Sequence, residues 1–447
     1  MRYRTWEPGV LVCIGRLTPM PEVDAAPQNS QQEEVETVAT ADIVLGVLSY
    51  NNAATIAEVI RNAIHGLEAN FPGGRSVLVH ADGGSHDGTA ELALQAAPDR
   101  KTMVQVAYPV YPVHLLSPDY NGIPGKGNAV RAVFEIARKL DAKACALVGA
   151  DLRELTPQWT EALVRPVIEG GFDLVTPYYV RHKYDGTVIN GIVYPLVRAL
   201  YGKQIRQPIG ADFGYSAKLI LHLTQQAPWD SDVTGAGVDA WITMQSIAWN
   251  FQLAQANLGP RVQNAGGPPL ELSTALAQVL GSLFTQIHHT ASAWQRFRAS
   301  EPVPVFGSAP RQAPEHLPVD VQPMIDSFRL GFRNLREIWR EVLPPATLLE
   351  LKKLASQPDA TFRFVDSTWA RIIYDFALAH RMRIMDSNHL LQAITPLYLG
   401  WLASYALQVR EANAGEVEQF VEALCQSFET QKGYFVARWR WPDRFNP

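Results

Sequence analysis

Short apolar segments alternate with amphipathic helical segments from Asp42 onward, and this alternation constrains the fold more than any other feature of the sequence. Residues 43–48 are continuously apolar, as in a strand buried on both faces. Apolar residues then recur at helical spacing as far as Leu67, and a second apolar run covers residues 76–81. Because strands and helices alternate, the sequence predicts an α/β fold with a mostly parallel sheet and helices on both faces.

The chain divides into four segments. Residues 1–41 are rich in Glu, Gln, Ala and Pro and have no apolar period, which is typical of a disordered leader. We expect the α/β domain to span residues 42–300, a proline-rich linker to span 301–323, and an α-helical C-terminal domain to span 324–447. Within the α/β domain we also expect strands at 102–108 and 144–148 and a long helix at 272–298.

The composition excludes several classes of partner. A net charge of -5 gives no reason to expect nucleic acid or an anionic membrane surface. No apolar run approaches the ~20 residues of a membrane-spanning helix, so we expect a cytoplasmic protein without a transmembrane segment. Cys13, Cys145 and Cys425 are far apart and match no metal-binding spacing, which indicates free thiols.

Polar turns follow the predicted strands, at the sheet edge where α/β proteins bind ligands. The first strand ends in Leu48-Ser49-Tyr50-Asn51, which can offer a nucleotide base an apolar wall and hydrogen-bonding groups. The second is followed by Asp82-Gly83-Gly84-Ser85, where Asp82 can accept hydrogen bonds and the glycines allow a close approach of the backbone. A capped strand-to-helix turn and a solvated turn are the purely structural alternatives.

A glycine-rich loop at residues 122–128 opens a helix and carries Lys126. Backbone N–H groups and the helix dipole favour a diphosphate at such a position, and the lysine adds a positive charge. A turn with an exposed lysine is the alternative. Further along, Asp212 and Asp239 each lie in a glycine-lined stretch, where the backbone must pass close to either a sugar ring or another helix.

These blocks, in their order and spacing, resemble the retaining GT-A glycosyltransferases that include glucosyl-3-phosphoglycerate and glucosylglycerate synthases and, more distantly, mannosylglycerate synthase. The resemblance extends from about Asp42 to Gln263. The helical C-terminal half, with Trp369-Ala370-Arg371 and the segment 395–400, is similar to the glucosylglycerate synthase branch. Between Asp42 and Gln263, the resemblance is carried by the blocks Leu48-Ser49-Tyr50-Asn51-Asn52, Asp82-Gly83-Gly84-Ser85, Gly125-Lys126-Gly127, Asp151-Leu152, Gln207-Pro208-Ile209-Gly210-Ala211-Asp212, Gly237-Val238-Asp239 and Asn257-Leu258-Gly259.

The resemblance implies a Rossmann-like GT-A fold and retaining transfer of a hexose, expected to be glucose, from a nucleotide-diphosphate sugar to glycerate or a glycerate-like acceptor. It also implies a role for each site residue. The donor would be bound by Leu48, Ser49, Tyr50, Asn51, Asp82, Gly83, Ser85, Lys126 and Asp151. Asp212, Asp239 and Lys126 would act in catalysis. Arg181, Thr187 and Asn190 would bind the acceptor carboxylate, a task that suits the forked guanidinium.

The sequence departs from the family at the expected Mg²⁺ or Mn²⁺ site. Gly149 stands where the family has an acid, and Gln263 stands where it has a histidine. Asp151 and Gln263 remain as metal ligands, and an amide oxygen binds a hard cation more weakly than a carboxylate. This departure leaves open a nucleotide-sugar-binding protein without turnover.

An inverting transferase that glycosylates a lipid phosphate or a polymer is a further alternative, because Asp212 or Asp239 could serve as its general base. Lys183, Lys203 and Arg206 could bind a phosphate on the acceptor or face water. The helical C-terminal domain offers a surface for a homodimer.

Overall fold

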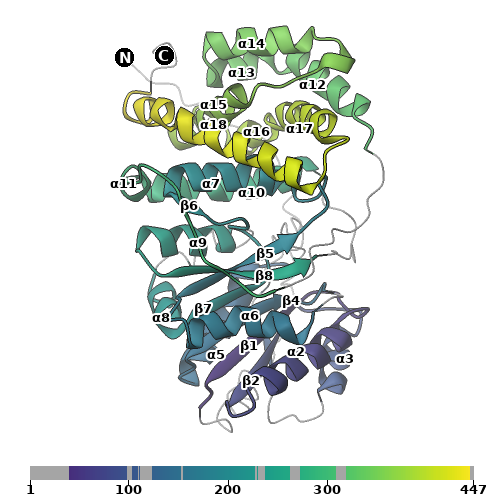
Figure 1. Cartoon of the computed structure of the whole chain (residues 1–447), viewed down its shortest axis with the longest axis vertical. Helices are drawn as coiled ribbons and strands as arrows, with labels where there is room; N and C mark the ends of the chain where they lie inside the picture. The colour runs from purple at the N-terminus through teal and green to yellow at the C-terminus, as the bar shows by residue number, and fades with distance from the viewer. Residues whose placement is uncertain are drawn as a thin grey trace, which may run out of the picture.

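The computed structural model describes residues 40–97, 103–108, 110, 123–152, 155–226, 229, 237–261, 272–308 and 319–442. Within them, an eight-stranded sheet with helices on its faces is followed by a helical C-terminal region, which lies above the sheet in Figure 1. The predicted α/β fold with a helical C-terminal part is confirmed. Residues 1–39 of the predicted leader, and Gln263, lie outside the described residues.

The sheet has the strand order β10-β8-β5-β7-β4-β1-β2-β3. Its first half, 3-2-1-4, is the order of a Rossmann-like sheet, in which β1 pairs in parallel with β2 and β4. Strand β7 runs antiparallel to β4 and β5. The strands are β1 Ile43–Ser49, β2 Ser76–Asp82, β3 Met103–Ala107, β4 Ala144–Gly149, β5 Leu174–Val180, β7 Phe213–Ser216, β8 Leu253–Pro260 and β10 Val305–Phe306.

Strand β1 is buried on both faces, and its alternating side chains enter two different cores. Val44 and Leu48 pack in the core that contains α5, whereas Leu45 and Val47 pack in the core that contains α2 and α6. This two-sided burial explains why the segment is continuously apolar. The helices of this part are α2 Ile56–Asn70, α3 Thr89–Ala96, α5 Lys126–Lys139, α6 Pro157–Ile168 and α8 Ala217–Thr224.

The long helix expected at 272–298 is shorter in the structure, where α10 Leu272–His289 ends before Thr290. Thr290 leaves the helical conformation, with φ -102° and ψ 21°, and its Oγ1 donates to the Gln286 carbonyl at 2.7 Å. A hydroxyl bonded back to the preceding turn competes with continuation of the helix. The chain then forms α11 Ala291–Trp294.

The segment 301–323, expected as a linker, begins with regular structure. Glu301–Pro302 forms β9, which pairs with β6 Lys203–Gln204, and β10 joins the edge of the main sheet in parallel with β8. Prolines, which have no backbone N–H to donate, are compatible with such short edge strands because one side of an edge strand forms no ladder hydrogen bonds. The chain is therefore tied to the α/β part up to Phe306, and Gln322 already begins α12.

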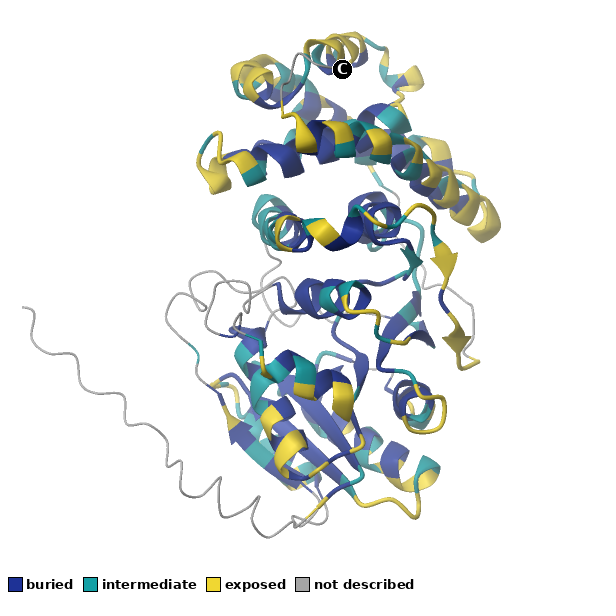
Figure 2. Cartoon of the chain, turned by 90° about the vertical axis from the view of Figure 1, so that its left-hand side faces the viewer, coloured by how far each residue is buried: buried dark blue, intermediate teal, exposed yellow. Residues whose placement is uncertain are grey.

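The C-terminal helices share a core with the α/β part instead of forming one of their own. Side chains of α15, α17 and α18 belong to the same buried cluster as those of α7 Tyr194–Tyr201 and α10. Figure 2 shows the buried faces of these helices turned toward one another. The helices are α12 Gln322–Asn334, α13 Arg336–Val342, α14 Pro345–Ala355, α15 Asp366–Met382, α16 Ser387–Gln392, α17 Thr395–Val409 and α18 Ala414–Arg440.

One stretch among the described residues, Ser387–Val409, is long and apolar enough to cross a membrane, with a mean hydropathy of 1.2. In the structure 67% of its apolar 18-residue window is buried, and a mostly buried core helix passes the same test of length and composition. Cys145 and Cys425 are buried free thiols, as expected, and Cys13 lies outside the described residues.

Candidate functional site

The ends of β1 and β2 are joined through Ser49 and Asp82, which are register partners. Ser49 Oγ donates to one Asp82 oxygen at 2.8 Å, and Ser85 Oγ donates to the same oxygen at 2.7 Å. The other oxygen accepts from the backbone N–H groups of Gly84 and Ser85 at 3.0 and 2.8 Å. Four hydrogen bonds match the acceptor capacity of a carboxylate, so Asp82 itself organises the turn.

Asn51 lies in the same turn and connects it to the end of β1. Its φ of 53° is left-handed, its N–H donates to Ser85 Oγ at 2.8 Å, and its side-chain oxygen accepts from His86 N–H at 3.0 Å. Gly83 N–H donates to the Ser49 carbonyl at 3.0 Å. The predicted donor-binding residues Ser49, Asn51, Asp82, Gly83 and Ser85 therefore form one hydrogen-bonded rim.

His80 lies directly beneath this rim and was not anticipated from the sequence. Its Nε2 is 2.8 Å from Ser49 Oγ, and its Nδ1 is 3.3 Å from Gln105 Nε2. The Ser49 hydroxyl donates its one hydrogen bond to Asp82. Nε2 must therefore carry the imidazole proton and donate to Ser49 Oγ, and Nδ1 must accept from Gln105. Burial lowers the pKa of His80 to about 4, so the imidazole is neutral at pH 7.

We expect this histidine to make the protein less stable in mild acid. In the unfolded chain its pKa returns to about 6.5, so between pH 6.5 and 4 the unfolded state binds more protons and stability falls as pH falls. From pH 6.5 to 5 the loss should be about 1.5 kcal/mol. Urea denaturation at the two pH values measures it, with His80→Gln as the comparison. Equal losses in both proteins would contradict the assignment.

Asp151 follows β4 and folds back over Gly149. A Cβ at position 149 would lie 2.6 Å from Asp151 Oδ1, so the carboxylate occupies the space that a side chain would need. The Gly149 N–H donates to Asp212 at 3.0 Å. The glycine found where an acid was expected thus leaves room for the Asp151 carboxylate beside the end of β4.

Arg261, directly after β8, is the residue that holds these carboxylates together. Its Nη1 bonds Asp212, and its Nη2 lies 3.3 Å from an Asp151 oxygen. Tyr179 donates to Asp212 and accepts from Arg261 at 2.8 Å. Burial alone would lower the pKa of Arg261, but Tyr179, Asp212 and Asp151 raise it well above its usual value. The guanidinium is therefore a permanent positive charge in the site.

Sequence reasoning missed Arg261 and Tyr179, although a signal existed. Both lie at the carboxyl ends of parallel strands, β8 and β5, which reach the same sheet edge as β1 and β4. Neither strand stands out clearly by its apolar pattern, because tyrosine, proline and glutamine interrupt them.

Lys126 and Asp239 form a buried ion pair that joins two of the predicted blocks. Lys126 Nζ lies 2.6 and 2.8 Å from the two Asp239 oxygens and 2.6 Å from the Gly210 carbonyl oxygen. The side chains are 1% and 4% exposed. Lys126, which was expected to bind a diphosphate, here orients Asp239 and ties it to the segment that carries Asp212.

The residues present are compatible with a divalent cation at Asp151. Mg²⁺ is commonly held by one or two carboxylates together with substrate phosphates and water. The Asp151 side chain is 20% exposed, whereas Asp212 is fully buried. No cluster of three or more His, Cys, Asp or Glu side chains occurs among the residues that the structure describes. A cation here would therefore take most of its ligands from the bound donor.

The expected acceptor-binding residues lie on the segment between β5 and α7, beside this cluster. The guanidinium carbons of Arg181 and Arg261 lie 5.1 and 5.0 Å from the centre of the Tyr179 ring. Thr187 Oγ1 is 2.6 Å from the hydroxyl of Tyr398, and the Asn190 side-chain oxygen accepts from Arg206 at 2.6 Å. The acceptor candidates thus continue the site toward the C-terminal helices.

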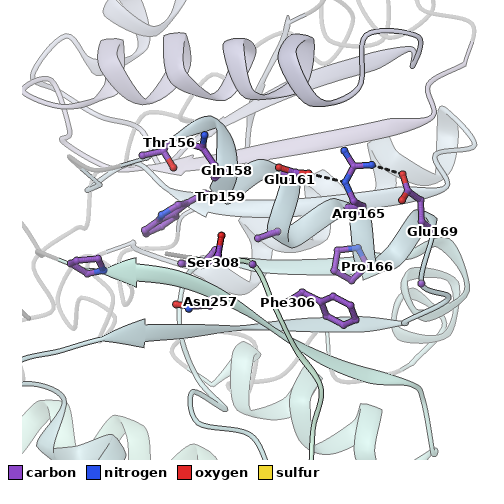
Figure 3. A pocket seen from close by; sticks show the side chains of 15 residues that line it. Thr156, Gln158, Trp159, Glu161, Arg165, Pro166, Glu169, Asn257, Phe306 and Ser308 are labelled. Atoms are coloured by element: carbon purple, nitrogen blue, oxygen red, sulfur yellow. Dashed lines mark hydrogen bonds and ion pairs between the residues drawn. The ribbon is translucent and has the colours of Figure 1, made fainter. Parts of the chain in front are cut away.

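A cavity of about 870 Å³ lies along α6, next to β8 and β10, and includes none of the expected site residues. Figure 3 shows Trp159, Pro166 and Phe306 on its apolar wall and Arg165 paired with Glu161 and Glu169. The ring of Trp159, which lines the cavity, lies 6.1 Å from the ring of Tyr179, which bonds Asp212 in the acidic cluster.

The fold and site define an α/β protein with a buried acid–guanidinium cluster at the carboxyl edge of its sheet. Searches of protein-family models and of curated proteins found no match. Among solved structures, the chain is similar to glucosyl-3-phosphoglycerate synthase from Mycobacterium tuberculosis in complex with phosphoglyceric acid, at 23% identity and a TM-score of 0.42, over 58% of this chain and 85% of that one.

Two further crystal structures of that mycobacterial enzyme are similar to this chain. One contains Mn²⁺, UDP-glucose and phosphoglyceric acid, and matches at 24% identity with a TM-score of 0.42 over 58% of this chain and 85% of that one. The other contains Mg²⁺ and UDP, and matches at 24% identity with a TM-score of 0.43 over 58% of this chain and 84% of that one.

Proposed function

We propose that the chain is a retaining hexosyltransferase that moves a hexose, expected to be glucose, from a nucleotide-diphosphate sugar to glycerate or a closely related hydroxy acid. The observation that carries this proposal is the presence of two buried ion-paired groups at the carboxyl edge of the sheet: Arg261 with Asp151 and Asp212, and Lys126 with Asp239. They are linked through the Lys126 bond to the carbonyl of Gly210, two residues before Asp212. Ligands of open α/β sheets bind at this edge.

The donor would lie across the ends of β1, β2 and β4. The nucleoside would lie against the rim that Ser49, Asn51 and Gly83 help to form, where Asn51 is exposed. The diphosphate would lie near Asp151 and the fixed charge of Arg261. Mg²⁺ or Mn²⁺ bound between Asp151 and the phosphates would offset the negative charge that builds up on the leaving group.

The hexose would face Asp239, whose position is fixed by Lys126. Asp212 and Asp239 are 0% and 4% exposed and already accept bonds from Arg261 and Lys126, which makes them poor nucleophiles. This supports attack by the acceptor hydroxyl on the face that the leaving group departs from, through an oxocarbenium-like transition state. The bond from C1 to the diphosphate breaks, the bond to the acceptor oxygen forms, and the hydroxyl proton passes to the leaving diphosphate.

The cations that could bind an acceptor phosphate are engaged elsewhere. Lys183 Nζ donates to the carbonyl oxygens of Arg410 and Ala412 at 2.6 and 3.2 Å, Lys203 pairs with Glu301, and Arg206 pairs with Glu418. We propose that Arg181 provides the guanidinium for the acceptor carboxylate. This pattern supports an acceptor with a single negative charge, such as glycerate, over its phosphorylated derivative.

A donor and acceptor panel tests the proposal. Purified protein is incubated with UDP-, GDP- or ADP-glucose, D-glycerate or 3-phosphoglycerate, and Mg²⁺ or Mn²⁺, and the product is analysed by NMR. We expect an α-glucoside of glycerate, with glycerate used at least about 10-fold more efficiently than 3-phosphoglycerate, because one unpaired buried charge costs more than 1.4 kcal/mol.

Other outcomes of the panel identify the alternatives. A product of inverted configuration would indicate an inverting transferase. Tight binding of a nucleotide sugar in calorimetry without any transfer would indicate a binding protein.

A further inference from the structure

We propose that Tyr398, on the C-terminal helix α17, is a positioning residue of the acceptor site, so that this site is completed by the helical region. The inference rests on the proposed function and extends it to a part of the chain outside the sheet. Its starting point is the hydrogen bond of 2.6 Å between the hydroxyls of Thr187 and Tyr398, which are 211 positions apart in the sequence.

The segment that carries Thr187 is continuous with the acidic cluster. Asp212 bonds Tyr179, and the guanidinium of Arg181 lies 5.1 Å from the Tyr179 ring centre. A Cβ at Gly186, whose φ is 62°, would lie 3.0 Å from Arg181 Cδ, so this glycine lets the arginine side chain lie against the turn that leads to Thr187. A small hydroxy acid bound by Arg181 would therefore be within reach of the Thr187 hydroxyl.

The C-terminal helices hold this segment at several points. Lys183 donates at 2.6 Å to the carbonyl of Arg410, the C-cap residue of α17, where a positive charge suits the helix C-terminus, and Tyr405 Oη donates to the Lys183 carbonyl at 2.6 Å. Trp369 Nε1 donates to the Gly191 carbonyl at 2.8 Å. The segment is thus fixed by hydrogen bonds from both α15 and α17.

The backbone between Ile189 and Val193 forms a π-helix, a distortion that is frequent at functional sites. A Cβ at Gly191 would lie 2.2 Å from the Trp401 ring, so the π-helix approaches α17 as closely as the backbone allows. Trp401 stacks on Trp369 with ring centres 5.7 Å apart, and the two indoles leave little freedom for the segment to move.

In this setting the hydroxyl of Tyr398 has a defined task. A threonine hydroxyl rotates freely unless a partner fixes it. If binding of the acceptor has to fix this hydroxyl, the lost rotational freedom lowers the affinity for the acceptor. Tyr398 is 1% exposed and lies among Trp369 and Trp401, so its own position is rigid. It therefore presets the Thr187 hydroxyl for the acceptor before the acceptor binds.

Binding of D-glycerate to the full-length protein in the presence of UDP, measured by calorimetry, tests this role. We expect Tyr398→Phe to weaken glycerate binding about 3- to 10-fold, the range of one net hydrogen bond, with UDP affinity unchanged. Tyr374→Phe is the matched control, because the Tyr374 hydroxyl donates at 2.8 Å to the Phe428 carbonyl inside the helical region. It should leave glycerate affinity at the wild-type value.

A double-mutant cycle separates positioning from general loosening of the structure. If Tyr398 acts through Thr187, the variant with both Thr187→Val and Tyr398→Phe should bind glycerate no more weakly than Thr187→Val alone. Unchanged glycerate affinity in Tyr398→Phe, or fully additive losses in the cycle, would overturn the proposal for Tyr398 alone. Failure of the wild-type protein to bind glycerate would overturn the proposed function as well.

Discussion

Replacing Arg261 by methionine is expected to lower the free energy of unfolding by about 3–5 kcal/mol and to abolish hexosyl transfer. The Arg261 side chain is 6% exposed and is the counter-charge of Asp212, which is 0% exposed and cannot be hydrated when its partner is removed. Methionine keeps an unbranched apolar stem in place of the arginine stem and lacks the guanidinium, so the unpaired carboxylate dominates the expected effect. Urea denaturation at pH 7.5 measures the loss.

Two further variants make the Arg261 experiment specific. Arg165→Met removes an arginine that pairs with Glu161 and Glu169 but is 39% exposed, and it should cost at most about 1 kcal/mol. Asp212→Asn, added to Arg261→Met, removes the buried charge and should restore part of the lost stability without restoring transfer. A stability loss for Arg261→Met no larger than that of Arg165→Met would contradict the assignment of a buried acid–guanidinium cluster.

Lys126→Met is expected to have an effect of similar size, because it leaves Asp239 buried without its partner. We expect a loss of about 3–5 kcal/mol in unfolding free energy. The informative variant is the double replacement of Lys126 by methionine and Asp239 by leucine. Since an apolar pair can replace a buried ion pair at little cost, this variant should unfold within about 1–2 kcal/mol of the wild type.

The double variant should nevertheless show no transfer to glycerate, because Asp239 is the group proposed to face the hexose. The double variant would then be nearly as stable as the wild type but inactive, as expected for an ion pair whose role is in function and not in stability. Calorimetric titration with UDP provides the control, since the nucleoside rim around Ser49 does not touch the pair and UDP should still bind. Wild-type transfer activity in the double variant would exclude Asp239 from the site.

The sequence was most informative where local chemistry decides local structure. The apolar run of β1 and the spacing of α2 and α5 predicted the first half of the sheet, because burial on both faces demands such a pattern. The expectation of an unbroken helix to 298 was wrong, since the bond from Thr290 to the preceding turn cannot be distinguished by periodicity from an ordinary helical threonine. The short strands at 301–306 were missed for a similar reason, because their pairing partners are distant in sequence.

In the site, too, local sequence predicted some features, and contacts between distant residues decided the others. Polar residues at the ends of apolar strands predicted that Ser49, Asp82 and Asp151 lie at one edge of the sheet, because parallel strands end there. The sequence could not show that Arg261 lies between Asp151 and Asp212, that Lys126 pairs with Asp239 across 113 positions, or that Tyr398 reaches Thr187. Hydrophobic periodicity is a short-range property of the chain, whereas ion pairs and hydrogen bonds depend on distances of a few ångströms that only the packed tertiary structure sets.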